Sequence, residues 1–230
     1  MREMYETDVY ADRNPTWHEG DASWKAAQIE KLMRRHRLEA STICEIGCGT
    51  GDILLNLERA FPDATLSGYE IAPQAVARAQ PKQTDRTSFH LADLLSQEGA
   101  HFDLVLAIDV MEHVDDYLGF AGRLRSFGTH TIFHIPLDLS VQSLARSWPI
   151  TNLRHDVGHL HYFYKETALA TLRDCGYTIV DHVYTASRLE LPDQARSSRL
   201  MKLPRRAFYA VNQDLAVRLL GGYSLLVLAS

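Results

Sequence analysis

The chain has 230 residues, of which 46% are apolar and 23% charged, and these proportions exclude a disordered or fibrous protein. Its formal charge of -5 disfavours a protein whose main partner is a nucleic acid, because such proteins present a basic surface to the phosphates. The length suits one well-buried core, so we expect a single domain over residues 1–230.

Strand and helix patterns alternate along the first part of the chain. The expected strands lie at residues 42–45, 65–69, 88–91, 102–108 and 131–135. The expected helices occupy residues 21–36 and 52–61, begin again at Pro73, and return over 114–127. The apolar run at 102–108 is typical of a central strand buried on both faces. This alternation predicts a parallel sheet covered by helices on both faces, with the ligand crevice at the carboxyl ends of the strands.

The alternation stops after Pro136. The remaining expected elements are a helix over 166–175, a strand over 177–184, a helix over 206–220 and a strand over 223–228. Long unpatterned segments inside a compact domain often carry function, so we expect residues 136–165 and 185–220 to be insertions on the substrate side. Residues 1–38 are expected to form an N-terminal helical lid or cap.

No targeting segment, disulfide or zinc site is expected. The opening MREMYETDVY lacks the apolar stretch of a secretory signal, and the C-terminal LLGGYSLLVLA is too short to cross a bilayer. Cys44, Cys48 and Cys175 form no CxxC pair, so they are expected to be reduced thiols. The expected location is the cytoplasm, without stable membrane insertion.

Three glycines stand at alternate positions between the first strand and its helix, in the segment Glu45-Ile46-Gly47-Cys48-Gly49-Thr50-Gly51. A glycine lets the backbone approach a ligand where a Cβ would collide, whereas a tight turn without a ligand would need only one. A dinucleotide fingerprint would place its last glycine one residue later, where this chain has Asp52. The spacing therefore indicates a cofactor other than NAD or FAD.

This segment resembles motif I of class I S-adenosylmethionine-dependent methyltransferases, an acidic residue followed by GxGxG, and the resemblance extends over most of the chain. It implies a Rossmann-like, doubly wound α/β fold with a mostly parallel seven-stranded sheet, helices on both faces and an antiparallel last strand. It implies S-adenosylmethionine as cofactor and S-adenosylhomocysteine as product. Gly47, Cys48, Gly49 and Gly51 would then pass along the methionine and ribose parts, while Glu45 organises the loop.

Acidic residues follow the next three strands. Glu70 is placed to accept hydrogen bonds from both ribose hydroxyls, and Ile71 to pack on the adenine. The resemblance assigns Asp93, with Leu94 beside it, to the exocyclic amine of adenine, although an Asp after a strand is also a common helix N-cap. It places Asp109 at the methionine end of the cofactor.

The segment Asp109-Val110-Met111-Glu112-His113-Val114 looks like the D-V-x-E-H-V segment of small-molecule methyltransferases. Adenine-N6 DNA methyltransferases carry an Asn or Asp followed by two prolines at this point, so a nucleobase acceptor is not expected. The resemblance implies that Glu112 and His113 hold the loop or border the acceptor.

Histidines are the candidate bases. Methyl transfer from a sulfonium depends mainly on positioning, but an alcohol acceptor gains from a general base, and His titrates in the useful range. The candidates are His159 first, then His134 and His113; purely structural histidines are an equal alternative. The spacing of His155, His159 and His161 also suggests a metal site, but no nearby carboxylate motif completes it, so no metal is expected.

Two further groups carry alternatives. The aromatic-rich N-terminal stretch, with Trp17 as a cofactor contact, would form a lid over the cofactor or simply anchor the first helix; its members are Tyr5, Tyr10, Trp17, His18 and Trp24. A basic concentration would be a solvated helix face, or would receive an anionic substrate or a membrane surface; it comprises Arg196, Arg199, Lys202, Arg205 and Arg206.

The sequence thus predicts an enzyme that methylates a hydroxyl or amine of a small molecule, such as a natural-product, quinone or sugar intermediate. A protein or RNA acceptor is an alternative that lacks the basic or aromatic surface it would use. A methyltransferase-like binding or scaffold module is another, and the intact glycines with Glu70 and Asp93 disfavour it. A monomer and a homodimer both remain open.

Overall fold

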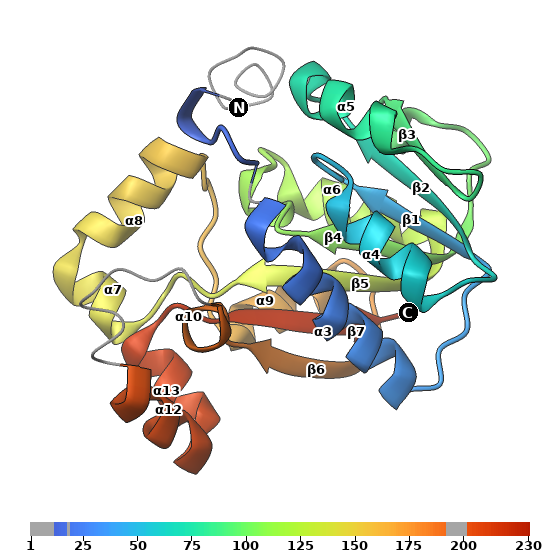
Figure 1. Ribbon diagram of the computed structural model, residues 1–230. Helices are drawn as coiled ribbons and strands as arrows, with labels where there is room; N and C mark the ends of the chain where they lie inside the picture. The colour runs from blue at the N-terminus through green and yellow to red at the C-terminus, as the bar shows by residue number, and fades with distance from the viewer. Residues whose placement is uncertain (1–11, 18, 192–201) are drawn as a thin grey trace.

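The computed structural model describes residues 12–17, 19–191 and 202–230, and a seven-stranded sheet lies at its centre (Figure 1). The strands are β1 Thr42–Ile46, β2 Thr65–Glu70, β3 Thr87–Leu91, β4 Phe102–Ile108, β5 Gly128–Pro136, β6 Ile179–Thr185 and β7 Ser224–Ala229. Their order across the sheet is β3-β2-β1-β4-β5-β7-β6. β1 to β5 pair in parallel, whereas β7 is antiparallel to both β5 and β6. The expected doubly wound sheet with an antiparallel last strand is confirmed.

Helices cover both faces of the sheet. The α-helices are α3 Ala22–Arg35, α4 Asp52–Ala60, α5 Pro73–Ala79, α6 Tyr117–Leu124, α7 Val141–Arg146, α8 Trp148–Asn152, α9 Lys165–Asp174, α10 Ser187–Glu190, α12 Lys202–Val211 and α13 Gln213–Leu220. Short turns of helix are η1 Glu19–Asp21, η2 Gln80–Lys82, η3 Leu94–Ser96, η4 Met111–His113, η5 Arg125–Phe127 and η6 Leu153–Val157. None of these described helices is long and apolar enough to pass through a membrane.

The two layers of helices bury alternate residues of the same strands. On β4, Leu104 and Leu106 pack against α3 and α4, while Val105 and Ala107 pack against α6 and α9. Successive side chains of a strand point to opposite faces, so an uninterrupted apolar run is what a sheet covered twice requires. This packing on both faces explains why β4 is apolar along most of its length.

The insertion after Pro136 has more regular structure than the sequence pattern indicated. The hydroxyls of Ser140 and Ser143 form a reciprocal capping box that starts α7, and Gly158, with φ of 80°, ends η6 in the left-handed region. Figure 1 shows α7 and α8 standing outside the helical layers of the sheet. The segment then returns along residues 158–164 to α9, close to η4.

The single helix expected over 206–220 is wrong, because the structure has two helices there. Asn212 adopts an extended conformation between α12 and α13, and its side chain accepts a hydrogen bond from the Leu215 backbone at 2.9 Å. The helical spacing of apolar residues continues across Asn212, so it did not predict that one helix ends and another begins there. The division depends on the Asn212 cap.

Candidate functional site

A cavity of about 560 Å³ opens at the carboxyl ends of β1, β2 and β4. β1 lies between β2 and β4. The strands that follow β1 are added first on its β2 side and then on its β4 side, so the strand order reverses next to β1. Ligands of open α/β sheets bind at such a switch point. The volume lies in the range of small-molecule and cofactor sites. The sequence-predicted residues that line it are Trp17, Glu45, Gly47, Cys48, Gly49, Glu70, Ile71, Asp93, Leu94, Asp109, His113 and His159. Gly51 and His134 are not among the lining residues.

The glycine turn leaves room on its cavity side. Gly49 has φ of 53°, and a Cβ built on it would meet nothing within 4 Å, so the turn is bare toward the cavity. Gly51, with φ of 81°, serves packing instead, because a Cβ there would lie 2.3 Å from the Phe89 ring. The glycines that predicted a ligand therefore have separate reasons, and Gly51 contributes to the site through the turn alone.

Glu70 joins the glycine turn to the start of α5. Its Oε2 accepts from the Gly49 backbone N–H at 3.0 Å, and its Oε1 accepts from Ile71 and Ala72 at 2.7 and 2.9 Å. Burial raises the pKa of Glu70, and the three N–H donors partly offset this. Glu70 is therefore fixed at the cavity wall before any ligand enters.

Glu45 lies deeper at the same wall and is almost fully buried. Its Oε2 has no hydrogen-bond partner, and burial raises its pKa, with Lys25 acting in the opposite direction. A buried acceptor without a donor is costly, so this oxygen indicates a missing N–H or O–H group from a ligand.

Asp109 is held in a strained backbone conformation, with φ of 54°, by two partners. Its Oδ2 lies 2.8 Å from Nζ of Lys25 on α3, and its Oδ1 lies 2.5 Å from Nδ1 of His134. Burial alone would raise the pKa of Asp109, but His134 and Lys25 lower it overall. Lys25 was missed in the sequence, although it follows Asp21 by one helical turn on the face that buries Ala22 and Ile29.

His134 has both ring nitrogens engaged in this network. Nδ1 lies against Asp109, and Nε2 lies 2.8 Å from Oγ1 of Thr185. The side chain is buried and does not line the cavity, so this arrangement does not favour the candidate role of His134 as a base. It orients Asp109 instead.

The expected adenine end combines both interpretations of Asp93. Its Oδ1 accepts from the Leu95 backbone at 3.0 Å and so caps η3, and the same residue lines the cavity beside Ile71 and Leu94. A carboxylate has lone pairs enough for a cap and a ligand together.

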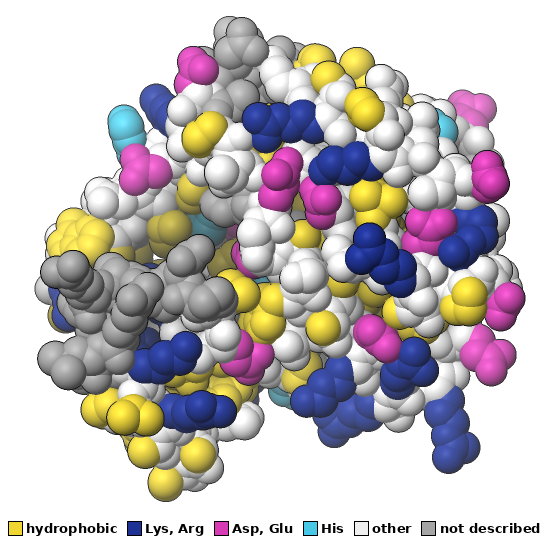
Figure 2. All heavy atoms as spheres, in the orientation of Figure 1, with side chains coloured by type: hydrophobic (Ala, Val, Ile, Leu, Met, Phe, Trp, Pro, Cys, Tyr) yellow, Lys and Arg dark blue, Asp and Glu magenta, His cyan; other side chains and the backbone are white. Residues whose placement is uncertain are grey.

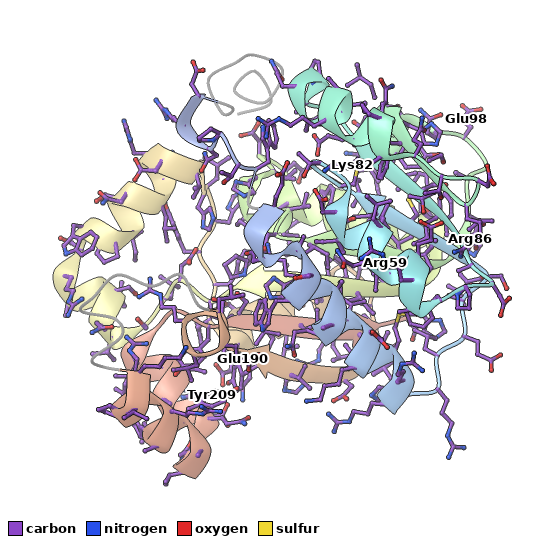
Figure 3. The ribbon with its side chains drawn as sticks, in the orientation of Figure 1. Arg59, Lys82, Arg86, Glu98, Glu190 and Tyr209 are labelled. Carbon is purple, nitrogen blue, oxygen red and sulfur yellow. The ribbon has the colours of Figure 1, made fainter. Side chains whose placement is uncertain are left out.

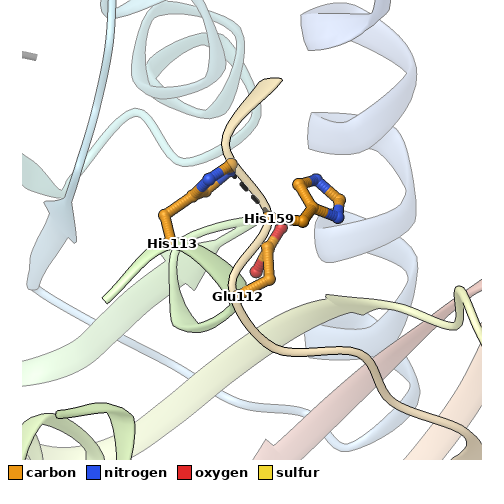
Figure 4. Close-up of side chains that lie close together, drawn as sticks. All are labelled: Glu112, His113 and His159. Carbon is orange, nitrogen blue, oxygen red and sulfur yellow. Dashed lines mark ion pairs between the residues drawn. The ribbon is translucent and has the colours of Figure 1, made fainter. Parts of the chain in front are cut away.

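The opposite end of the cavity brings together Glu112, His113 and His159, whose candidate ligand atoms all lie within 4.8 Å of one another (Figure 4). Nδ1 of His159 lies 2.7 Å from Oδ2 of Asp138, and Nδ1 of His113 lies 3.2 Å from the carbonyl oxygen of Gly158. The sequence singled out Glu112 and His113 in one motif and His159 apart from them. It gave no sign that they meet, because the meeting depends on the insertion folding back onto η4.

Backbone bonds fix this fold-back. The carbonyl oxygen of Glu112 accepts from the N–H groups of Leu160 and His161 at 2.7 and 3.2 Å. The local His155, His159 and His161 set does not converge: the His155 side chain is 74% exposed beside Asp156, and Nε2 of His161 lies 2.9 Å from the Val114 carbonyl oxygen. His159 alone of these three reaches the cavity.

The N-terminal segment reaches across the cavity mouth. Arg13 and Asn14 donate to the carbonyl oxygens of His155 and Asp156 at 2.5 and 3.1 Å, and Arg78 of α5 donates to Pro15 at 2.8 Å. Trp17 lines the cavity between these ties. Trp24 belongs to α3 and donates at 2.6 Å to Glu190 of α10, so it anchors the helix. Glu190 is labelled in Figure 3. Tyr5, Tyr10 and His18 lie outside the described residues.

The described arginines of the basic segment differ in their surroundings. Arg205 donates to the carbonyl oxygens of Leu220 and Gly221 and to Oε1 of Gln142, so the prediction of a solvated face is wrong for this residue. Arg206 is exposed, and Figure 2 shows Lys and Arg side chains beside apolar ones over α12 and α13. Arg196 and Arg199 lie outside the described residues.

Comparison with known proteins points to one family. Residues 17–182 match the model of a family described as a methyltransferase domain. The chain is 26% identical over 127 residues to a trans-aconitate 2-methyltransferase of Mycobacterium marinum, covering 51% of this chain and 48% of that protein. It thus spans about half the length of that relative. It is 24% identical over 184 residues to a ubiquinone biosynthesis O-methyltransferase of Xanthomonas campestris, covering 72% and 76%.

Solved structures share the fold. Magnesium protoporphyrin IX methyltransferase from Synechocystis, solved with bound SAH, superposes with a TM-score of 0.67 at 16% identity, covering 99% of this chain and 96% of that one. The cyclopropane synthase MmaA2 from Mycobacterium tuberculosis gives a TM-score of 0.60 at 16% identity, covering 89% and 84%.

Proposed function

This chain belongs to the methyltransferase domain family, and from that premise we propose that it moves the methyl group of S-adenosylmethionine to a hydroxyl or amine of a small molecule. The observation that supports the proposal is the set of residues that line one cavity. The glycine turn, Glu45 and Glu70 line one end, and His113 and His159 line the other. Donor and acceptor ends thus share one space at the edge of the sheet.

The cavity suits a cationic cofactor. Among the described residues that line it, Lys25 and Arg123 are the basic ones, against the acidic Glu19, Asp21, Glu45, Asp52, Glu70, Asp93, Asp109, Glu112, Asp115 and Asp116. S-adenosylmethionine carries a sulfonium, an ammonium and one carboxylate, so an acidic cavity attracts its net positive charge, whereas it repels the pyrophosphate of a dinucleotide. The unpartnered Oε2 of Glu45 would accept from the ammonium, and Glu70 would accept from the ribose.

The histidine end prepares the acceptor. When bound, S-adenosylmethionine supplies an activated methyl group, so the chain's part is to place the acceptor oxygen and remove its proton. His159, held by Asp138 at the cavity wall, is the first choice for the residue at which that proton is lost. His113 packs edge to face against it, with ring centroids 4.9 Å apart, and fixes its position.

The donor is tested by calorimetry. We expect S-adenosylmethionine and S-adenosylhomocysteine to bind and NAD not to bind. Tight binding of NAD without binding of S-adenosylmethionine would overturn the proposal. The acceptor is then sought by following release of S-adenosylhomocysteine with candidate metabolites. The panel starts from hydroxyl-bearing ubiquinone precursors and includes trans-aconitate, whose carboxylates lie outside the proposed acceptor class, because relatives are named for reactions on these compounds.

His159→Ala tests the acceptor end. We expect turnover to fall by at least about tenfold while the dissociation constant of S-adenosylmethionine stays unchanged. His155→Ala is the matched control on the same segment, because its exposed side chain is outside the cavity. An unchanged rate in His159→Ala would remove His159 from the reaction.

A further inference from the structure

We propose that Glu112, His113 and His159 bind one divalent transition-metal ion, such as Zn²⁺ or Co²⁺, at the acceptor end of the cavity. The role of the ion in methyl transfer rests on the proposed function, whereas its binding rests on the geometry of the three residues. Their candidate ligand atoms lie within 4.8 Å of one another. Two atoms bound at about 2.1 Å to one ion are at most about 4.2 Å apart, so small side-chain rotations complete the site.

Both histidines are oriented as metal ligands are. Nδ1 of His159 lies 2.7 Å from the Asp138 carboxylate, and Nδ1 of His113 lies 3.2 Å from the Gly158 carbonyl oxygen. When Nδ1 carries the proton and donates to these oxygens, the lone pair is on Nε2. In His113 that atom is 3.8 Å from Oε1 of Glu112. A carboxylate or carbonyl behind each imidazole is the arrangement found around histidines that bind metals.

Glu112 supplies the independent observation. Its side chain is fully buried, and neither Oε1 nor Oε2 has a hydrogen-bond partner among the described residues. The nearby cation Lys25 forms ion pairs with Asp109 at 2.8 Å and with Asp21 at 3.2 Å rather than with Glu112. A buried carboxylate that accepts no hydrogen bond is costly as an anion, and a metal ion bound between it and the two imidazoles would offset that cost.

The ligand set indicates the kind of ion. Two imidazoles and one carboxylate favour zinc, cobalt, nickel or iron(II), whereas magnesium and calcium prefer oxygen ligands alone. Three protein ligands leave positions open toward the cavity, as in catalytic sites. An acceptor with two adjacent oxygen atoms, such as a hydroxy carboxylate or a catechol, would occupy two of them.

The ion would take over the activation of the acceptor. It lowers the pKa of the hydroxyl, whose proton leaves to solvent, and His159 then acts as a ligand. The acceptor oxygen forms its bond to the methyl carbon while the carbon–sulfur bond breaks, and the electron pair of that bond stays on sulfur. The ion keeps its oxidation state throughout.

The test uses the full chain after treatment with a chelator. Titration with Co²⁺, followed by calorimetry and by visible absorption, should show one ion per chain in a low-coordinate site. Glu112→Gln, which keeps the shape of the side chain, and His159→Ala should each weaken Co²⁺ binding by at least about tenfold. His155→Ala is the control and should leave the affinity unchanged.

The outcomes separate this proposal from the proposed function. Absence of Co²⁺ binding by the wild-type chain overturns the metal site. Wild-type affinity for Co²⁺ in both Glu112→Gln and His159→Ala also overturns it, even when the chelated protein still methylates an acceptor. Stoichiometric Co²⁺ binding that depends on Glu112 and His159 supports the site, even when S-adenosylmethionine does not bind. Circular dichroism, measured on each variant, reports that the variant is folded.

Discussion

Glu70 connects the glycine turn to the start of α5 through hydrogen bonds at the cavity wall. Three backbone N–H groups, from Gly49, Ile71 and Ala72, converge on its two carboxylate oxygens. These bonds orient the carboxylate and hold the bare glycine turn against the end of β2. A single side chain therefore shapes the turn and presents lone pairs to the cavity at the same time.

Replacement of this carboxylate by an amide tests that dual role. In Glu70→Gln, an NH₂ group meets one of the N–H donors, so two donors face each other and the turn loses an acceptor. We expect the dissociation constant of S-adenosylmethionine to rise by at least about tenfold in calorimetry. Glu98→Gln, at an exposed loop position, is the matched control (Figure 3). A folded Glu70→Gln protein with unchanged affinity would remove Glu70 from the cofactor site.

The sequence-predicted residues that line the cavity are mostly those whose position follows from local order. Glu70 ends β2, and Gly49 and Asp93 lie within three residues of the ends of β1 and β3, and parallel strands bring their carboxyl ends to one edge. Lys25 reaches Asp109 from a different layer, and Glu112 meets His159 only because the insertion folds back. Such meetings depend on tertiary packing, which no spacing along the chain records.

At the scale of elements, the register of β1 against β4 is fixed by one carboxylate. Oδ2 of Asp103 accepts from the backbone N–H groups of Ser41 and Thr42 and from the Thr42 hydroxyl, which in turn accepts from the Asp103 backbone. The Thr42 N–H bond is the main cause that lowers the pKa of Asp103. The alternating pattern predicted both strands, but their register depends on such cross-strand bonds.

This pKa direction gives a prediction for stability against pH. A folded-state pKa below the unfolded one means that the stabilisation is present above the unfolded value, near pH 4, and is lost as the pH falls through the folded value. Asp103→Asn should therefore lower the free energy of unfolding at pH 7 by about 1 kcal/mol, given the exposure of the site, and by less at pH 3. Urea unfolding at both pH values measures this, with the exposed Asp85→Asn as control. An equal loss at pH 7 and pH 3 would contradict it.

At the scale of the whole molecule, the cavity is closed by segments from distant parts of the chain. The sheet supplies its floor, η4 and the insertion supply the wall that carries His113 and His159, and residues 12–17 cross the mouth. The antiparallel β7 was implied by the family resemblance, whereas the strand order was not predicted, since periodicity does not say which parallel strands are neighbours. The bridge from Arg13 to η6 joins residues 142 positions apart and had no sequence signal.

Removal of residues 1–20 tests whether this bridge acts as a lid. The fold should persist, because α3 begins at Ala22 and is held by its own buried face, which includes Ile29 and Met33. The cavity would lose Trp17 and Glu19, so water would reach the cofactor, and we expect the dissociation constant of S-adenosylmethionine to rise by about tenfold. Calorimetry measures this, and circular dichroism confirms folding. Arg13→Ala alone, which removes one tie and keeps Trp17, should give a smaller loss. A folded truncated chain with unaltered affinity for S-adenosylmethionine would show that residues 1–20 do not act as a lid over the cofactor.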